Sequence, residues 1–159
     1  MSETARRATE TDLARLVELH RAAVADLREE RGGAMWAVRE ARPEPVEQAL
    51  ADSLADPGGC VIVGSYANAV VGYAAAHTEV LRDGSRLAVL DEIFVEPEAR
   101  DVAVGEMMME EVLGWCRELG CRGIDALALP GMRHSKNFFE RFGLTARAII
   151  VHRRLTDPS

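Results

Sequence analysis

Apolar residues in the first third of the chain recur at the spacing of amphipathic helices. The first such pattern opens at Thr9-Glu10-Thr11-Asp12, which resembles a helix-capping box, and it predicts a helix that runs to about Glu30. Gly32-Gly33 ends this helix, and an irregular segment follows. A second helix is predicted from Pro45 to Ala55, because proline is well tolerated in a first helical turn.

The middle of the chain has the alternating, β-branched pattern of strands. A short edge strand is expected around Arg6-Arg7-Ala8, and three longer strands are expected at residues 60–66, 70–81 and 86–95. Arg82-Asp83-Gly84-Ser85 is a typical hairpin turn, so the three longer strands should form an antiparallel meander. Pro97 removes a backbone donor and ends the last of them.

The second half alternates between helical and extended patterns. It predicts a helix over 104–119, a strand over 123–129, a short helix over 134–142 and a final strand from Ala148 to Leu155. The predicted order is therefore β-α-α-β-β-β-α-β-α-β. This order indicates an α/β chain with a mixed sheet flanked by helices.

Composition excludes several classes of protein. The chain has 159 residues, 48% of them hydrophobic, which is enough for one domain with its own core. The longest apolar run is too short for a membrane span, and the N-terminus does not resemble a signal peptide. The net charge of −7 argues against general nucleic-acid binding, which works by neutralising phosphates.

Cysteines and histidines give no metal or disulfide pattern. The three cysteines form no CxxC pair and the four histidines no HxxxH pair. We therefore expect no metal, and buried thiols in a reducing compartment, which favours a cytoplasmic protein.

The segment from Leu90 to Glu106 carries candidate chemistry. It is predicted to be a strand, a turn and the start of a long helix. The first N–H groups of a helix lack partners within it, and with the helix dipole they attract anions. Arg100 would add a charge-assisted contact to a phosphate. The alternative is an ordinary connection without a ligand.

Several of these residues resemble a known family. Val95-x-Pro97-x-x-Arg100-x-x-Ala103-x-Gly105 looks like the acetyl-CoA loop of the GNAT family of N-acetyltransferases, usually V-x-P-x-x-R-G-x-G-x-G/A. Phe138 to Leu144 resembles the family's F-Y-E-x-x-G-F signature, and Val71-Gly72-Tyr73 and Arg7-Ala8-Thr9 also fit. The resemblance implies that residues 1–159 form a single GNAT-like acetyltransferase domain with a central, mostly antiparallel sheet flanked by helices.

The resemblance also implies where acetyl-CoA would bind. The backbone of Ile93, Phe94 and Val95 would pair with the pantetheine arm like an added strand. Asn137 or Lys136 would reach the far end of the cofactor, unless they are only solvated surface residues. The pyrophosphate would be held by the loop and the first helical turn, through Arg100, Asp101, Val102, Ala103, Val104, Gly105 and Glu106.

Three positions depart from the family pattern. Asp101 places a carboxylate beside the expected pyrophosphate, which repels it unless the side chain points to solvent. Ala103 replaces a glycine, narrows the approach and disfavours a positive φ. Phe139 replaces the tyrosine that usually protonates the leaving thiolate. These departures support an alternative interpretation, a non-catalytic GNAT-like module that binds a CoA ligand or a protein partner.

The reaction that the resemblance implies is direct acetyl transfer to a primary amine of a small molecule or peptide. A base must take a proton from the ammonium, and the Val95 N–H would stabilise the oxyanion. Glu92 is the first candidate for the base and Asp91 the second. Strand alternation predicts that Glu92 shares a face with Leu90 and Phe94. Asp91 would then lie on the opposite face. A partly apolar cleft would raise the carboxylate's pKa.

Acceptor binding is expected from residues 28–42, where Trp36 would line a pocket or else anchor the core. Tyr73 and His77, four apart on one strand, are further candidates, with packing and an edge position as alternatives. The net acidic charge favours a cationic acceptor. A basic run near the end is either a solvated strand face or a surface for a homodimer: Arg147, His152, Arg153 and Arg154.

Overall fold

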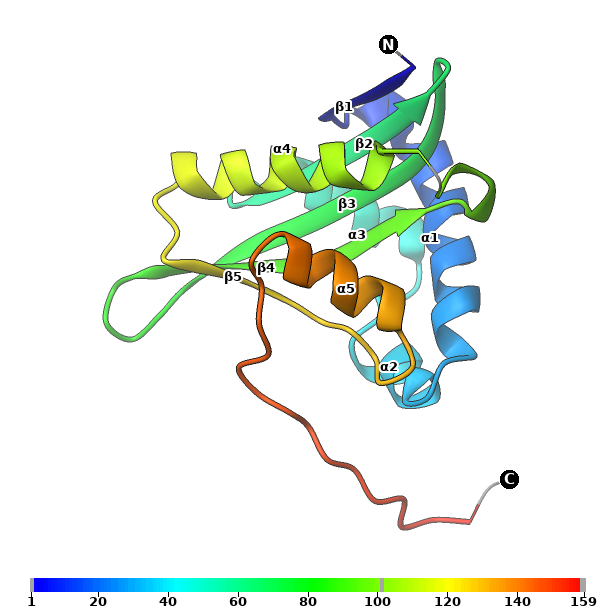
Figure 1. Cartoon of the computed structure of the whole chain (residues 1–159), viewed down its shortest axis with the longest axis vertical. Coiled ribbons are helices and arrows are strands. Elements are labelled where there is room, and N and C mark those ends of the chain that lie inside the picture. The colour runs from blue at the N-terminus through cyan, green and yellow to red at the C-terminus, as the bar shows by residue number, and fades with distance from the viewer. Residues whose placement is uncertain (1, 101, 158–159) are drawn as a thin grey trace.

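The computed structural model describes residues 2–100 and 102–157 of the chain. Within these residues, five strands form one sheet (Figure 1). The strands are β1 (Glu3–Arg7), β2 (Gly59–Tyr66), β3 (Ala69–Val80), β4 (Arg86–Val95) and β5 (Gly123–Ala126). The helices are α1 (Leu13–Arg28), α2 (Gly33–Arg39), α3 (Val46–Ala55), α4 (Val104–Glu118) and α5 (Arg133–Arg141), with 3-10 turns η1 (Glu10–Asp12) and η2 (Pro97–Ala99).

The sheet has the strand order β1-β2-β3-β4-β5. The first four strands pair in antiparallel fashion, and β5 pairs in parallel with β4. A parallel neighbour requires a crossover, which α4 provides. The predicted mixed, mostly antiparallel sheet flanked by helices is therefore confirmed.

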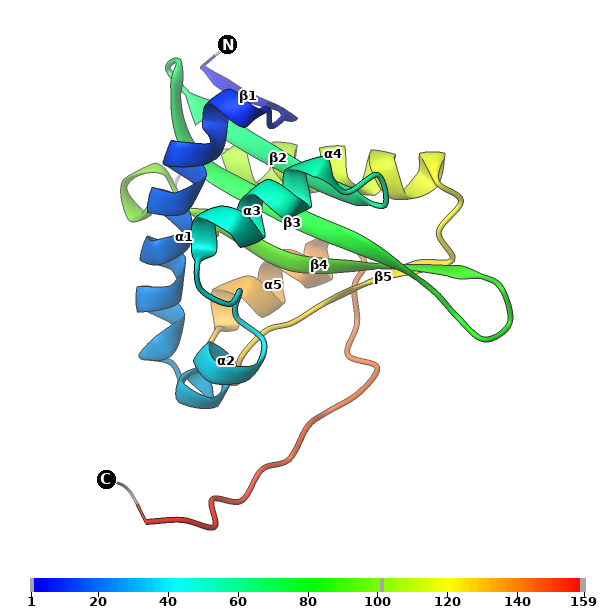
Figure 2. The ribbon, with the colours of Figure 1, turned by 180° about the vertical axis from the view of Figure 1, so that it is seen from behind.

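Helices cover both faces of the sheet. In Figure 1, α4 and α5 lie in front of the strands, whereas Figure 2 shows α1, α2 and α3 on the opposite side. Each face has its own apolar core, which we call the α4 face and the α1 face. Met108 and Val112 of α4 are fully buried in the first, and Leu16 of α1 and Leu50 of α3 in the second.

Glycine at position 64 lets α4 approach the sheet. A Cβ at Gly64 would overlap Val104 Cγ1 and would lie 2.9 Å from Met108 Sδ, which is closer than real atoms come. The first turn of α4 therefore packs directly on the backbone of β2. This contact fixes the position of the helix N-terminus relative to the strands.

Two elements differ in kind from the predictions, and others differ only in their bounds, such as β5, which ends at Ala126 instead of residue 129. Residues 33–39, expected to be irregular, form α2, and this helix places Trp36 in the interior. The final strand from Ala148 to Leu155 was predicted wrongly, since these residues take no strand partner in the structure. Strand propensity alone does not form a strand, because a strand also requires backbone pairing with a neighbour, which residues 148–155 do not make.

The structure also bears on two classes of site. No helix among the described residues is long and apolar enough to cross a membrane. In the same part of the chain, no group of three or more metal-ligating side chains comes together.

Candidate active site

A β-bulge in β4 brings the two candidate carboxylates to the same face of the sheet. Ala75 of β3 pairs with Glu92 and Ala76 pairs with Leu90, so Asp91 is the extra residue. Leu90 packs on the α4 face, whereas Glu92 contacts side chains of the α1 face. The predicted alternation, with Asp91 and Glu92 on opposite faces, is therefore wrong. A bulge redirects side chains in this way by adding one residue to one strand.

Glu92 is a buried carboxylate with three side-chain partners. Its Oε2 accepts a hydrogen bond from Tyr73 Oη and lies 2.7 Å from His20 Nδ1. Its Oε1 accepts a hydrogen bond from Arg42 Nε. Only 10% of the Glu92 side chain is exposed, and His20 and Tyr73 are more deeply buried. Both carboxylate oxygens are thus occupied by groups of the protein itself.

These partners determine the charge state of Glu92. Burial by itself raises the pKa of this carboxyl, but the hydrogen bond to His20, the charge of Arg42 and the bond from Tyr73 outweigh burial. The net pKa of Glu92 is lowered, so the expected raised pKa is wrong for this residue. Burial and the neighbouring carboxylate also raise the pKa of Tyr73 well above its usual value, which keeps its hydroxyl protonated as a donor.

Arg42 ties the segment between α2 and α3 to the sheet. Besides Glu92, its guanidinium donates to Ser53 Oγ at 2.6 Å and to the Ala49 carbonyl at 3.4 Å, both on α3. Residues 28–42 were expected to bind the acceptor, but Arg42 and His20 were not predicted as site residues. The sequence does contain an indication for His20, because it is a polar ring on the buried stripe of α1. It contains no indication for Arg42, because the partner of Arg42 is 50 residues away along the chain.

Asp91 differs from Glu92 in exposure and charge state. Its Oδ2 lies 2.7 Å from His77 Nδ1, and 36% of its side chain is exposed. Burial raises the pKa of Asp91, and His77 and Arg42 offset this only in part, so the expected raised pKa is confirmed here. Burial lowers the pKa of His77, but the hydrogen bonds and charges of Asp91 and Glu79 reverse this and raise it. The pair can share a proton and remain open to a ligand.

The parallel pairing of β4 with β5 ends at this point. The last paired residues are Leu90 and Ala126, and β4 then continues to Val95 with β3 as its neighbour. The Glu96 N–H donates to the Val71 carbonyl at 2.8 Å, so antiparallel alternation turns the N–H and C=O of Val95 away from β3. This free edge, directly after the carboxylates, fits strand-like pairing with an extended ligand.

The turn that leads into α4 fits an anion at its N-terminus. Ala103, the N-cap, has φ −82°, so the expected conflict with a positive φ does not arise there. A Cβ at Gly105 would contact Phe138 at an ordinary 3.5 Å, so the helix start is not crowded by α5. Asp101 lies outside the described residues.

The Arg100 side chain has partners other than the helix N-terminus. Its Nε donates to the Val95 carbonyl at 2.8 Å, and its Nη2 lies 3.1 Å from Asp26 Oδ2 on α1. The guanidinium also stacks over the ring of Phe94, 5.5 Å from its centroid. In this arrangement Arg100 holds the turn against β4 and α1 rather than presenting its charge to the loop.

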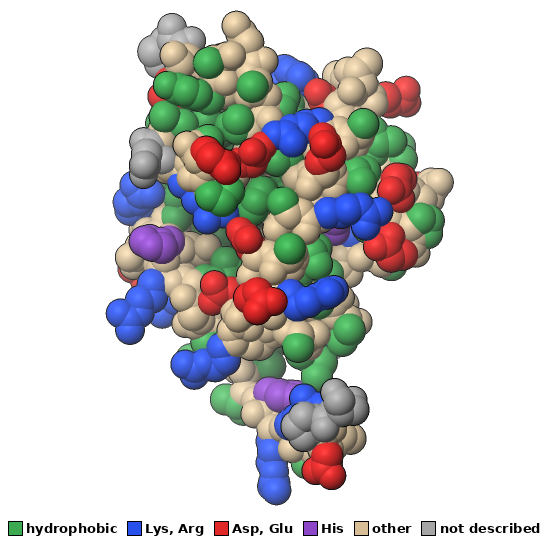
Figure 3. All heavy atoms as spheres, turned by 90° about the vertical axis from the view of Figure 1, so that its right-hand side faces the viewer, with side chains coloured by type: hydrophobic (Ala, Val, Ile, Leu, Met, Phe, Trp, Pro, Cys, Tyr) green, Lys and Arg blue, Asp and Glu red, His purple; other side chains and the backbone are tan. Residues whose placement is uncertain are grey.

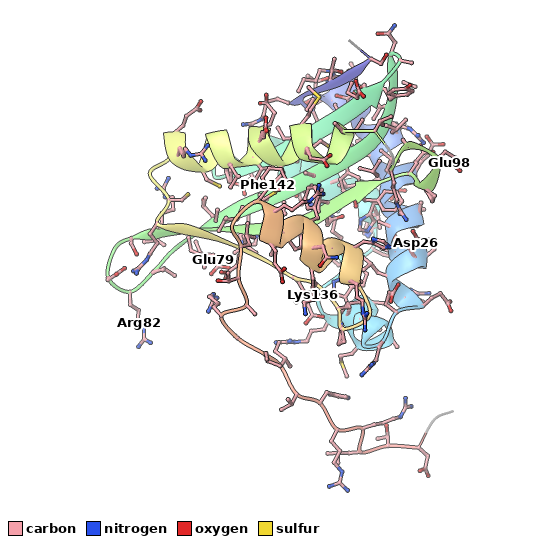
Figure 4. The ribbon with its side chains drawn as sticks, viewed as in Figure 1. Asp26, Glu79, Arg82, Glu98, Lys136 and Phe142 are labelled. Atoms are coloured by element: carbon pink, nitrogen blue, oxygen red, sulfur yellow. The ribbon has the colours of Figure 1, made fainter. Side chains whose placement is uncertain are left out.

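The remaining candidates are divided between core and surface. Trp36 has 7% exposure and Phe139 8%, so both are packed in the interior. Asn137 is exposed on α5. Figure 4 shows Lys136 on the same helix and Asp26 on α1, and Phe142 at the end of α5 close to α4. Phe139 cannot donate a proton, and its ring packs edge-on to Phe138 within the α4-face core.

Two of the three cysteines, Cys60 and Cys116, are buried and poorly suited to act as nucleophiles. Burial raises the pKa of Cys60 to about 11 and that of Cys116 to about 12, so these thiols stay protonated at neutral pH. A covalent route through either thiol is therefore disfavoured.

Comparisons with known proteins agree with this geometry. The sequence model of the Acetyltransferase (GNAT) family matches residues 17–144. Acetyltransferases of this family use acetyl-CoA, as the sequence analysis expected. A search of curated protein sequences finds no match.

Several solved structures have the same fold at low sequence identity. A mutant of the BH1408 protein from Bacillus halodurans has a TM-score of 0.81 at 14% identity, over 96% of this chain and 99% of that one. AAC(6')-Iy, in complex with the bisubstrate analog CoA-S-monomethyl-acetylneamine, has a TM-score of 0.75 at 18% identity. The match covers 99% of this chain and 100% of AAC(6')-Iy. The aminoglycoside acetyltransferase meta-AAC0020 from an uncultured soil metagenomic sample, in complex with sisomicin, has a TM-score of 0.72 at 18% identity. The match covers 98% of this chain and 97% of that one.

Proposed function

Because the chain belongs to the GNAT acetyltransferase family, we propose that it transfers an acetyl group from acetyl-CoA directly to a primary amine of a small molecule or peptide. The observation that carries the proposal is the coincidence of three features at one place on β4. The pairing with β5 ends at Leu90, the bulge follows at Asp91, and the free strand edge runs on to Val95. A ligand on that edge would lie beside two carboxylates.

The chain offers two sets of backbone groups for acetyl-CoA, which supplies the acetyl group as an activated thioester. Of Ile93, Phe94 and Val95, the backbone groups of Ile93 and the N–H of Val95 face the free edge and would bind the pantetheine amides, whereas Phe94 pairs with β3 and the Val95 carbonyl accepts from Arg100. The N–H groups at the start of α4 would bind the pyrophosphate. The contributing residues there would be Asp101, Val102, Ala103, Val104, Gly105 and Glu106, with Asn137 at the far end, whereas the Arg100 guanidinium is held by Val95 and Asp26.

Asp91 is better suited than Glu92 to accept the proton of the amine. An acceptor enters as an ammonium ion, which has no lone pair until a base removes a proton. Asp91 has a raised pKa and is partly exposed, so its carboxylate can accept the proton and release it to solvent while His77 stays within hydrogen-bonding distance. Glu92 has a lowered pKa and both oxygens engaged, so we assign it, with Tyr73, the role of positioning the strand and Arg42.

Substitution of Asp91 tests the proposal. Asp91→Asn keeps the shape and the contact to His77 but removes the base, so kcat/KM for an amine should fall by about 10²- to 10⁴-fold. The measurement is release of free CoA thiol with acetyl-CoA and a panel of small amines and peptides. Asp83→Asn, the same change on the β3–β4 hairpin, is the matched control and should leave the rate unchanged.

The same assay separates the alternatives. Full activity in Asp91→Asn together with an inactive, folded Glu92→Gln would return the role of base to Glu92. In our assignment Glu92→Gln instead changes KM and stability more than kcat. Binding of acetyl-CoA in a calorimetric titration without turnover on any amine would favour the non-catalytic module, with which phenylalanine at position 139 is consistent.

The acceptor class follows from charge. The chain carries −7, and Glu79 adds a carboxylate beside the His77–Asp91 pair. A cationic amine would be drawn to this region, whereas an anionic one would be repelled. Two of the structural neighbours are named for aminoglycosides or a neamine analog, which are polyamines. We therefore expect small polycationic amines to be the best members of the panel.

A further inference from the structure

His20 is a buried titratable side chain that has no role so far in the acetyl transfer. It lies on α1, and only 2% of the residue is exposed. Its Nδ1 lies 2.7 Å from Glu92 Oε2 and 3.3 Å from Tyr73 Oη. The Tyr73 hydroxyl donates to the same carboxylate, and Arg42 donates to its other oxygen. One side of the imidazole ring is therefore held by groups from β3 and β4.

The contact with Glu92 determines which ring nitrogen of His20 carries the proton. Because the pKa of Glu92 is lowered, this carboxyl is ionised at neutral pH and can only accept hydrogen bonds. His20 Nδ1 must therefore be the donor of the bond between them. In the neutral ring Nε2 then has no proton and keeps its lone pair. Glu92 thus fixes both the tautomer and the orientation of the imidazole.

The second nitrogen of the ring is open. Both hydrogen bonds of the His20 ring to residues that the structure describes involve Nδ1, and neither involves Nε2. In the same residues, no polar side-chain atom is both fully enclosed and without a partner. Nε2 therefore lies in the small part of the ring that solvent reaches. A fixed, neutral imidazole with an accessible lone pair is suited to accept a proton from a ligand.

The position of His20 places this lone pair near the proposed reaction. Its partner Glu92 directly follows the bulge at Asp91, and the free edge of β4 begins where the pairing with β5 ends at Leu90. Helix α1 lies on the side of the sheet that these carboxylates face (Figure 2). The ring therefore faces the part of β4 at which the acceptor is proposed to bind.

Acetyl transfer to a primary ammonium ion removes two protons from its nitrogen. The first leaves before the attack, because an ammonium ion has no lone pair, and Asp91 is its proposed acceptor. The lone pair then forms the C–N bond, and the electrons of the C–S bond leave with the sulfur. The nitrogen still holds one proton more than a neutral amide has. This second proton also needs an acceptor.

We propose that His20 is a catalytic residue of the transfer and that its Nε2 accepts the second proton of the acceptor nitrogen. The imidazolium that forms keeps its Nδ1–H on Glu92, and this carboxylate stabilises the positive charge, as a buried carboxylate does beside other catalytic histidines. Release of the proton to solvent restores the neutral ring. The inference rests on the proposed acetyl transfer, to which it adds a residue.

The variant His20→Asn tests the two nitrogens of the ring separately. The asparagine amide can donate to Glu92 in place of Nδ1–H, but no atom replaces Nε2. With acetyl-CoA and an amine that the parent protein accepts, kcat should fall by about 10²-fold or more while the circular dichroism stays that of the parent. His134→Asn, the same change at an exposed histidine of α5, is the matched control and should keep the rate of the parent.

The variant His20→Ala decides the question if His20→Asn does not fold. It removes the whole ring, and imidazole added to the solution can occupy the space and accept the proton. The rate of His20→Ala should therefore rise with the imidazole concentration, whereas the rate of Asp91→Asn should not. A folded His20→Ala that imidazole does not reactivate would contradict a proton-accepting role of the ring.

Nitrogen-15 NMR of the histidine rings gives a readout that does not depend on turnover. Without acetyl-CoA, the signals that His20→Asn removes should show a neutral ring with a proton on Nδ1 and none on Nε2. A neutral ring that carries its proton on Nε2 would overturn the proposal, as would a His20→Asn variant with the kcat of the parent. Absence of turnover by the parent on every amine would instead overturn the acetyl transfer itself.

Discussion

Arg42 and Glu92 form a nearly buried ion pair, with 13% and 10% of their side chains exposed. Removing one member of such a pair leaves an uncompensated charge in a poorly solvated place. We predict that Arg42→Ala lowers the free energy of unfolding at pH 7 by about 3–5 kcal/mol. Urea denaturation followed by circular dichroism measures this change.

The pH dependence of that loss follows from the lowered pKa of Glu92. A carboxyl whose pKa is lowered in the folded state stabilises the protein at pH values above 4.5, which is its ordinary pKa. This contribution is lost as the pH falls through the lowered pKa of the folded state. Loss of Arg42 raises the folded pKa of Glu92, so the gap between Arg42→Ala and the parent protein should be full at neutral pH and shrink as the pH falls toward the lowered pKa of the parent's Glu92. Arg39→Ala removes an exposed arginine instead and should change stability by less than about 0.5 kcal/mol. A gap that widens in acid would contradict the assignment.

At the scale of elements, the contact between α4 and β2 depends on Gly64. A methyl group there would meet Val104 and Met108 at distances that force one of the elements to move. We predict that Gly64→Ala lowers the free energy of unfolding by about 1–3 kcal/mol, as overpacking does. Because the start of α4 is the expected pyrophosphate site, the affinity for CoA should fall as well. Thermal unfolding and calorimetric titration give the two values.

Gly114, which lies on α4 itself, provides a control whose substitution should change the free energy of unfolding in the opposite direction. A Cβ at this position would meet no atom within 4 Å. Gly114→Ala should therefore stabilise α4 by up to about 1 kcal/mol through helix propensity alone. Equal effects at the two glycines would show that the close approach at Gly64 does not limit the packing of α4.

At the scale of the whole molecule, the net charge of −7 should act on the acceptor through salt. Figure 3 shows acidic and basic side chains interspersed on one face, so the effect comes from the overall balance rather than from one patch. At 0.1 M salt the Debye length is about 10 Å, and more salt screens the attraction further. We predict that KM for a polycationic amine rises severalfold between low and high salt. KM for an amine that is neutral at the assay pH should stay constant. If salt changed KM equally for both amines, the protein's electrostatic field would have no role in acceptor binding.

Local patterns in the sequence determined most elements and the place of the expected cofactor site. Helix and strand periodicity, the capping box at Thr9 and the motif from Val95 to Gly105 depend on neighbouring residues, so they can be found along the chain. Tertiary structure decided the chemistry around the carboxylates. One extra residue in β4 placed Asp91 and Glu92 on the same face, and partners far away in the sequence gave their pKa values opposite shifts.

Residues 148–155 show the same division between local and long-range information. Their sequence determined a strong preference for extended structure, which is a property of each residue. Whether a strand forms depends on a neighbouring edge that supplies hydrogen bonds, and no local pattern encodes where that edge lies. In the same way the sequence determined that the chain is acidic, and it predicted an anion-binding turn. Only the fold decided which carboxylate is free to take a proton, because burial and hydrogen bonds are set by residues brought together from distant parts of the chain.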